Sequence, residues 1–163
     1  MLSRSLFLLS LAAVFTWAAD PEASTGNEPR RVTLRGHIVE LHAEINKSHG
    51  LDLKNRVGSI WAFKTVKGEI VTLLKTRRSL ALFMDERLRQ RELIIKGRQF
   101  PNSQAVEATF IQSVHEGIVH DLYYYCEICS IKALTPEICA CCREPVRLVE
   151  EPLKTNLDGE PAQ

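Results

Sequence analysis

Apolar and polar residues alternate over short stretches of the chain between residues 31 and 125. A period of two places successive side chains on opposite faces of an extended strand. Val32 and Leu34, for example, each stand between polar or charged residues. Gly36, within the same stretch, indicates a bulge or a sharp bend. The pattern predicts six strands, at residues 31–42, 58–65, 69–76, 92–97, 105–115 and 118–125.

Other segments of this region break the alternation. Apolar residues follow Ser79 at helical spacing, and Ser is a favoured N-cap, so we expect one short amphipathic helix over residues 80–90. Residues 46–57 are mostly polar and are predicted to form a loop. Lys67-Gly68 lies between the second and third strands and predicts a hairpin turn, because Gly adopts a positive φ without strain.

The order of the predicted elements resembles that of the OB-fold, a small five-stranded Greek-key barrel. Three strands, a helix and two further strands follow one another over residues 31–117. The resemblance implies a mostly β protein with a small OB-like five-stranded barrel and one short helix. A Cys-rich, zinc-ribbon-like module is expected to follow it at residues 118–148. Another small β-barrel, or a sandwich with one helix, is the alternative.

The composition is that of an ordinary globular chain of about one domain. The chain has 163 residues, of which 45% are hydrophobic and 25% charged, which excludes a wholly disordered or collagenous protein. The formal net charge of +1 creates no global field that would attract nucleic acid or a membrane. Residues 19–30 lack bulky apolar side chains and are predicted to be a flexible linker. Residues 149–163 are predicted to be a disordered acidic tail.

The first 18 residues have the pattern of a secretory signal peptide. Arg4 precedes an apolar run over residues 6–15, and Thr16 and Ala18 are small residues suited to cleavage after position 18. The run is too short to span about 30 Å of hydrocarbon comfortably, so a cleaved signal is favoured over an uncleaved membrane anchor. We therefore expect an exported protein, periplasmic or extracellular, with no stable membrane span after cleavage.

All five cysteines lie in one short part of the chain. Cys126 and Cys129 form one C-x2-C pair, Cys139 and Cys142 form a second, and nine residues separate the pairs. Two such pairs supply the four thiolates of a tetrahedral zinc site, as in a zinc ribbon, so we predict these four residues as metal ligands. Zinc is the expected ion, and copper(I), which soft thiolates also suit, is the alternative. Cys141 remains as an additional thiol.

The same segment resembles the small heavy-metal-binding domain of bacterial copper- and cation-handling proteins. That family has an aromatic residue before its first Cys, a Pro in the gap and a C-x2-C pair at the end. Tyr125 and Pro136 stand at matching positions, whereas Cys129 replaces a His of the family and Arg143 replaces a Gly. The resemblance implies a metal site and does not specify the metal.

Disulfide bonds are the main alternative for the cysteines, because exported proteins meet an oxidising compartment. Two disulfide bonds among the four cysteines of the C-x2-C pairs would leave Cys141 as a free thiol. A core of this size does not need disulfide bonds for its stability. Use of one C-x2-C pair in thiol–disulfide exchange is a further alternative.

Eight basic residues between positions 75 and 98 suggest a second kind of ligand. Together with aromatic residues they favour an anionic polymer, either an oligosaccharide or single-stranded nucleic acid. Export makes nucleic acid the less favoured of the two, and a solvated surface is the simplest interpretation. The candidate anion-binding residues are Lys75, Arg77, Arg78, Arg87, Arg89, Arg91, Lys96 and Arg98.

The chain contains none of the common local motifs of enzyme active sites. It lacks G-x-S-x-G, H-E-x-x-H and a phosphate-cradling Gly-rich loop. We therefore expect a non-enzymatic binding or structural protein whose protein or polymer partner the sequence does not identify.

Overall fold

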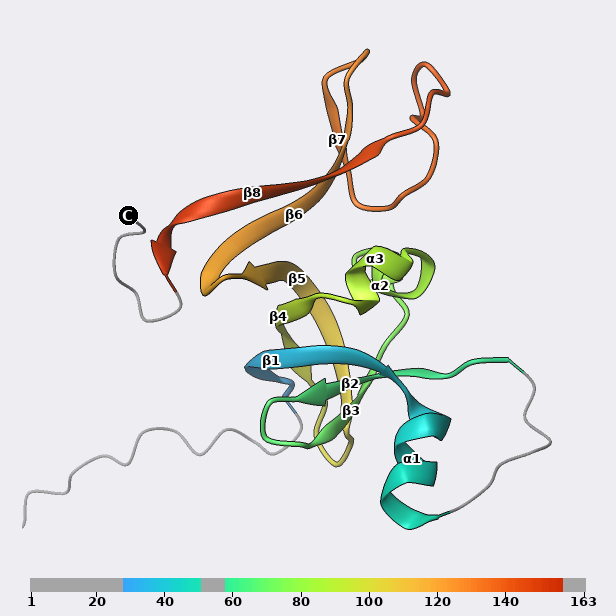
Figure 1. Ribbon diagram of the computed structural model, residues 1–163, viewed down its shortest axis with the longest axis vertical. Coiled ribbons are helices and arrows are strands. Elements are labelled where there is room, and N and C mark those ends of the chain that lie inside the picture. Colours follow the sequence, from blue (N-terminus) through green and yellow to red (C-terminus); the bar gives the residue numbers. More distant parts are fainter. Residues whose placement is uncertain (1–27, 51–57, 157–163) are drawn as a thin grey trace, which may run out of the picture.

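The fold is mostly β, which confirms the class that the alternating pattern predicts (Figure 1). The computed structural model describes residues 28–50 and 58–156. The predicted signal peptide, most of the linker, part of the 46–57 loop and the end of the acidic tail lie outside the described residues. In chain order the elements are β1 Arg30–Glu40, α1 Leu41–His49, β2 Trp61–Thr65, β3 Ile70–Leu73, α2 Leu80–Met84, α3 Glu86–Arg89, β4 Glu92–Gln99, β5 Ala105–His115, β6 Ile118–Cys126, β7 Ile131–Ala133 and β8 Arg147–Asn156.

Five strands form a closed ring of hydrogen-bonded neighbours. They follow the order β3-β2-β1-β4-β5 with antiparallel pairing, and parallel pairing of β3 with β5 closes the ring. The helices α2 and α3 lie between β3 and β4 in the chain, where the OB-like element order places its helix. Phe63, Leu93 and Ile95 from the strands pack with Leu82 and Leu88 from the two helices in a fully buried core.

Gly36 lets β1 contribute to two neighbouring parts of the ring. Residues 30–36 pair with β4, and residues 36–40 pair with β2, with no break in either register. A side chain at this position would collide with the carbonyl oxygen of Lys64 in β2. The glycine therefore marks a close approach of two backbones, and the predicted alternative of a bulge within β1 is wrong.

The helical segments differ from the prediction in two places. Helix α1 begins where the first strand was expected to end and covers the start of the 46–57 loop. None of its residues is fully buried, and its apolar face is confined to the half-buried Leu41 and Ile45, which is too short a stripe to predict a helix from sequence. The helix predicted over residues 80–90 is divided, because Asp85 is extended and caps α3 by accepting a hydrogen bond from Arg87 N–H. Among the helices of the described ranges, none combines the length and apolar character that crossing a membrane requires.

The prediction of a disordered tail over residues 149–163 is wrong for its first half. Strand β8 continues to Asn156 and pairs with β6. Two of the acidic residues that indicated a loose tail have basic partners: Glu150 lies 2.8 Å from Arg91, and Glu151 lies 3.8 Å from Lys132. Arg91 is 59 residues away from Glu150 in the chain, so local composition does not reveal the pairing.

Strand β6 connects the ring to the cysteines. Its first residues pair with β5, its last residues pair with β7, and β8 pairs along most of its length. In Figure 1, β6 and β8 extend together away from the ring, toward the loops at the far end of the molecule. We call residues 127–146, which lie between β6 and β8, the cysteine segment.

Candidate metal site

The four predicted metal ligands lie in two turns that the fold brings together. Cys126 is the last residue of β6, and Cys129 lies in the turn that leads to β7. Cys139 and Cys142 lie in a second turn further along the cysteine segment. A backbone hydrogen bond of 2.9 Å from Arg143 N–H to the Cys139 carbonyl closes this second turn.

The four sulfur atoms form a compact cluster, all within 4.8 Å of one another. Tetrahedral zinc, with Zn–S bonds of about 2.3 Å, holds its sulfur ligands about 3.8 Å apart. Cys126 Sγ and Cys142 Sγ are 3.4 Å apart, well beyond the S–S bond length of about 2.05 Å, and all five cysteines are free thiols. Cys126 and Cys139 are buried, and Cys129 and Cys142 are half-buried. The cluster therefore has the donor atoms and spacing that can hold a metal ion.

Backbone N–H groups point at the first sulfur of each C-x2-C pair. Cys139 accepts hydrogen bonds from the N–H groups of Cys142 and Cys141, which lower the pKa of its thiol to about 7. Cys126 accepts from the N–H groups of Cys129 and Ile128, which lower its pKa, but burial and the neighbouring thiols outweigh them and the net pKa is raised. Both turns therefore offer the same backbone support to a thiolate, the form in which cysteine binds a metal.

The residue after each C-x2-C pair has a left-handed backbone. Ser130 follows Cys129 with φ of 54°, and Arg143 follows Cys142 with φ of 63°. This conformation favours glycine, because a β carbon meets the following carbonyl there. At both positions a residue with a β carbon therefore holds a backbone conformation that glycine would adopt with less strain.

Replacing Arg143 by Gly is expected to stabilise the protein. The variant relieves the left-handed strain and gives up part of that gain to the greater freedom of glycine in the unfolded chain, which leaves about 0.5–1 kcal/mol. Denaturant unfolding measures the change. Arg143→Ala is the matched control, since it removes the same charge but keeps a β carbon. Equal stability of the Gly and Ala variants would contradict strain at this position.

Cys141 lies beside the cluster but outside the group of four. Its side chain is exposed, whereas Cys139, two residues earlier, is buried. A hydrogen bond between the Cys141 and Cys129 thiols is the largest of several effects that raise the pKa of Cys129. The additional thiol predicted from the sequence is thus adjacent to a proposed ligand, with its backbone N–H directed at Cys139.

A buried polar network next to the site escaped the sequence analysis. Tyr124 donates a hydrogen bond of 2.7 Å from its hydroxyl to Asp85 Oδ2, and Arg87 forms an ion pair of 2.6 Å with the same oxygen. Hydrogen bonds from Arg87 and Tyr124 lower the pKa of Asp85 to about 2, whereas burial raises the pKa of Tyr124 above its usual value. Tyr124 lies two residues before Cys126, so the network fixes β6 against the helices close to the cysteines. The only sequence signal was a charged residue inside an apolar helical pattern.

The eight candidate anion-binding residues are divided among different partners. Arg87, Arg91 and Arg98 form ion pairs of 2.6–2.8 Å with acidic residues. Arg89 lies 4.4 Å from the centre of the Trp61 ring. Lys75 lies over Phe83 at 6.0 Å, and Lys96 over Phe110 at 5.7 Å, while Arg77 and Arg78 are exposed. Of the eight, Lys96 and Arg98 line one cavity together.

Fold and site thus define a mostly β protein whose C-terminal part carries a four-thiol cluster able to hold a metal ion. Comparisons with protein-family models, with curated proteins and with solved structures found no match.

Proposed function

We propose that this chain is an exported, non-enzymatic protein that binds one zinc ion through Cys126, Cys129, Cys139 and Cys142. The observation that carries the proposal is the position of four sulfur atoms within 4.8 Å of one another. Four protein ligands complete a tetrahedral shell and leave no position for a catalytic water, so the ion has a structural role. Copper(I) favours fewer thiolate ligands, which makes zinc the better match to a cluster of four.

The packing of the cysteine segment supports a structural role. Within residues 127–146 the buried residues are Thr135 and Cys139. Large apolar side chains in this segment are exposed instead, with exposed fractions of 70% at Ile128 and 62% at Ile138. A segment with so little apolar burial gains little stability from the hydrophobic effect. A metal ion joining its two turns would supply the missing free energy, because metal binding and local folding are coupled.

The OB-like order of strands in the ring suggests a scaffold of the OB type that holds the metal-stabilised segment at the end of β6. Export remains a proposal that rests on residues 1–18 of the sequence. It predicts that the mature protein, recovered from the periplasm or the medium, begins at Ala19, which N-terminal sequencing tests.

Metal content and thiol state, measured on the full chain produced through its export route, test the zinc site. We expect one equivalent of zinc per chain by elemental analysis, and five titratable thiols after denaturation with a chelator. Cys139→Ser should lose the metal, whereas Cys141→Ser should retain it as the matched control. Two disulfide bonds with one free thiol and no metal would overturn the proposal and favour the oxidised or redox-active alternative. One equivalent of copper would overturn the choice of zinc.

A further inference from the structure

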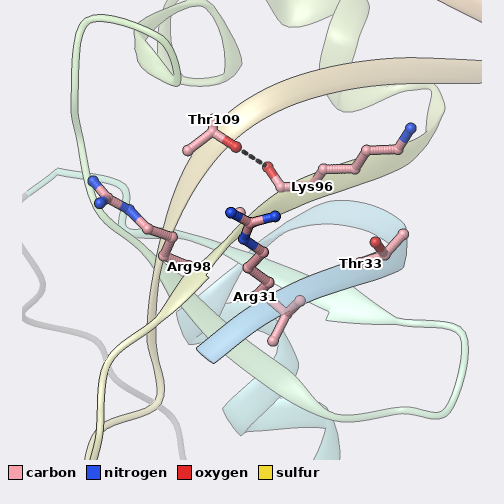
Figure 2. A pocket seen from close by; sticks show the side chains of 7 residues that line it. Arg31, Thr33, Lys96, Arg98 and Thr109 are labelled. Atoms are coloured by element: carbon pink, nitrogen blue, oxygen red, sulfur yellow. Dashed lines mark hydrogen bonds between the residues drawn. The ribbon is translucent and has the colours of Figure 1, made fainter. Parts of the chain in front are cut away.

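A basic cavity lies on the outer face of the ring, where β1 and β4 are neighbours. It has a volume of about 530 Å³ and is lined by Arg31, Val32, Thr33, Lys96, Gly97, Arg98 and Thr109. Figure 2 shows the Arg31 guanidinium pointing toward the hydrogen bond between Thr109 and the Lys96 carbonyl, with Arg98 and Lys96 extending to either side. Three cations and two hydroxyl-bearing side chains therefore border one open space.

A β-bulge shapes this cavity. In the ladder between β4 and β5, Lys96 pairs with Phe110 and Gly97 pairs with Ala108, so Thr109 is the extra residue. The extra residue of a bulge is left out of the ladder and its side chain is directed to a new position. Here the Thr109 hydroxyl donates a hydrogen bond of 3.0 Å to the Lys96 carbonyl. Bulges are common beside binding sites for this reason.

The charges around the cavity are incompletely balanced within the protein. Arg31 and Arg98 are directly opposite each other on neighbouring strands, an arrangement of like charges that costs stability. Arg98 is neutralised by Glu107 at 2.6 Å. Across the described residues, no acidic side chain pairs with Arg31 or with Lys96, and the Lys96 ammonium lies over the Phe110 ring. Nearby on the same pair of strands, Arg35 has an acidic partner in Glu92 at 2.7 Å.

We propose that this cavity binds the sulfate or phosphate ester groups of an anionic polysaccharide, with Arg31 and Lys96 as the cations that contact the ligand. An oxoanion in the cavity would offset the repulsion between Arg31 and Arg98 and accept charge-assisted hydrogen bonds from the Arg31 and Lys96 side chains. The cavity is much larger than a single oxoanion, which indicates a group carried by a larger molecule. The site lies apart from the cysteines and does not depend on the metal.

The chemistry of the lining favours a polysaccharide over single-stranded nucleic acid. Proteins that bind single strands stack successive bases on several aromatic side chains. Beside this cavity Phe110 offers one exposed ring, with 44% of its surface accessible, while Phe63 is buried in the core and Trp61 lies against Arg89. Hydroxyl groups and cations instead match the hydroxyl and ester groups of a sugar polymer.

Binding of a short heparin oligosaccharide to the full chain, measured by calorimetry at low salt, tests the proposal. The double variant Arg31→Ala and Lys96→Ala should bind at least roughly tenfold more weakly, since it loses charge-assisted hydrogen bonds. Lys47→Ala with Lys67→Ala is the charge-matched control, because both side chains are exposed and lie outside the cavity lining. The control should bind as the unmodified chain does.

A variant that gains affinity completes the test. Glu107→Gln releases the Arg98 guanidinium to the ligand and should tighten binding roughly two- to fivefold, the equivalent of one exposed ion pair. Equal weakening of the cavity variant and its charge-matched control, with both variants folded by circular dichroism, would overturn the site. Tighter binding of a single-stranded oligonucleotide than of the heparin oligosaccharide would overturn the choice of ligand.

Discussion

Removing the metal ion is expected to open the cysteine segment while the five-stranded ring stays folded. Residues 127–146 bury little apolar surface, whereas Phe63, Leu93 and Ile95 give the ring its own core. Structural zinc sites in small domains have apparent binding free energies of about 10–16 kcal/mol, and that free energy is also folding free energy for the residues that the ion organises. A chelator should therefore have its main effect in one part of the chain.

Hydrogen exchange measured by mass spectrometry, with and without a strong chelator, gives the regional readout. Amide exchange in residues 127–146 should accelerate at least about a thousandfold, equivalent to about 4 kcal/mol of local stability. Exchange in β1 and β4 should change little. Re-adding zinc to the reduced protein should restore protection. Unchanged exchange in the cysteine segment after complete metal removal would contradict a structural ion.

Single cysteine variants separate the role of the ion from that of the thiols. Cys139→Ser removes a buried sulfur of the cluster, so its cysteine segment should exchange as fast as that of the chelated protein. Cys141→Ser changes a neighbouring, exposed sulfur outside the group of four. It should retain protection in the presence of zinc. Loss of protection in both variants would show that Cys141 is also needed, and the four-ligand assignment would then be wrong.

The parts of the structure that local pattern encodes were predictable from sequence. Alternation identified the strands of the ring because each has one face toward the core, and the C-x2-C spacing identified the sulfur cluster because each pair is closed by its own turn. Helix α1 was not predicted because none of its residues is fully buried and its apolar face is short. Strand β8 was missed because Glu150 resembles a tail residue until its distant partner Arg91 is known.

The basic cavity is likewise a feature that the local sequence pattern does not predict. Arg31 was placed at the boundary between the linker and the first strand, with no sign of a role. Its place in a site depends on the register that sets it opposite Arg98 and on the bulge that turns Thr109 toward the same space. Both features depend on how β4 pairs with β1 and with β5, and the residues of one strand taken alone do not specify that pairing.

Replacing Asp85 by Asn is expected to cost about 2–3 kcal/mol of stability and to remove much of the protein's sensitivity to acid. The carboxylate is buried and accepts hydrogen bonds from Arg87 and Tyr124, so an amide in its place loses a charge-assisted acceptor. The Arg87 side chain is 56% exposed, which keeps the loss below that of a fully buried ion pair. Urea unfolding at neutral pH measures it.

The pH dependence follows from the lowered pKa of Asp85. A carboxyl with a pKa of about 2 in the folded protein and 3.8 as its ordinary value stabilises the fold at any pH above the ordinary value. That contribution, about 2 kcal/mol, is lost as the pH falls from about 4 toward 2, because the folded state must then take up a proton at a site that favours the anion. Stability of the Asp85→Asn variant should therefore decline less over this range than that of the unmodified chain.

Two further variants distinguish the network from a general loss of negative charge. Tyr124→Phe removes one donor and keeps the ion pair with Arg87, so it should retain most of the acid-dependent change in stability while lowering the stability itself by about 1.5 kcal/mol. Glu92→Gln removes an acidic residue whose pKa is also lowered, chiefly by its hydrogen bond with Arg35, but whose ion pair lies at the surface. Its stability should change by less than about 1 kcal/mol. If Glu92→Gln and Asp85→Asn reduced the dependence of stability on pH equally, surface charge would account for the acid sensitivity. The hydrogen bond between Asp85 and Tyr124, which joins β6 to the helices beside the cysteines, would then make no specific contribution to it.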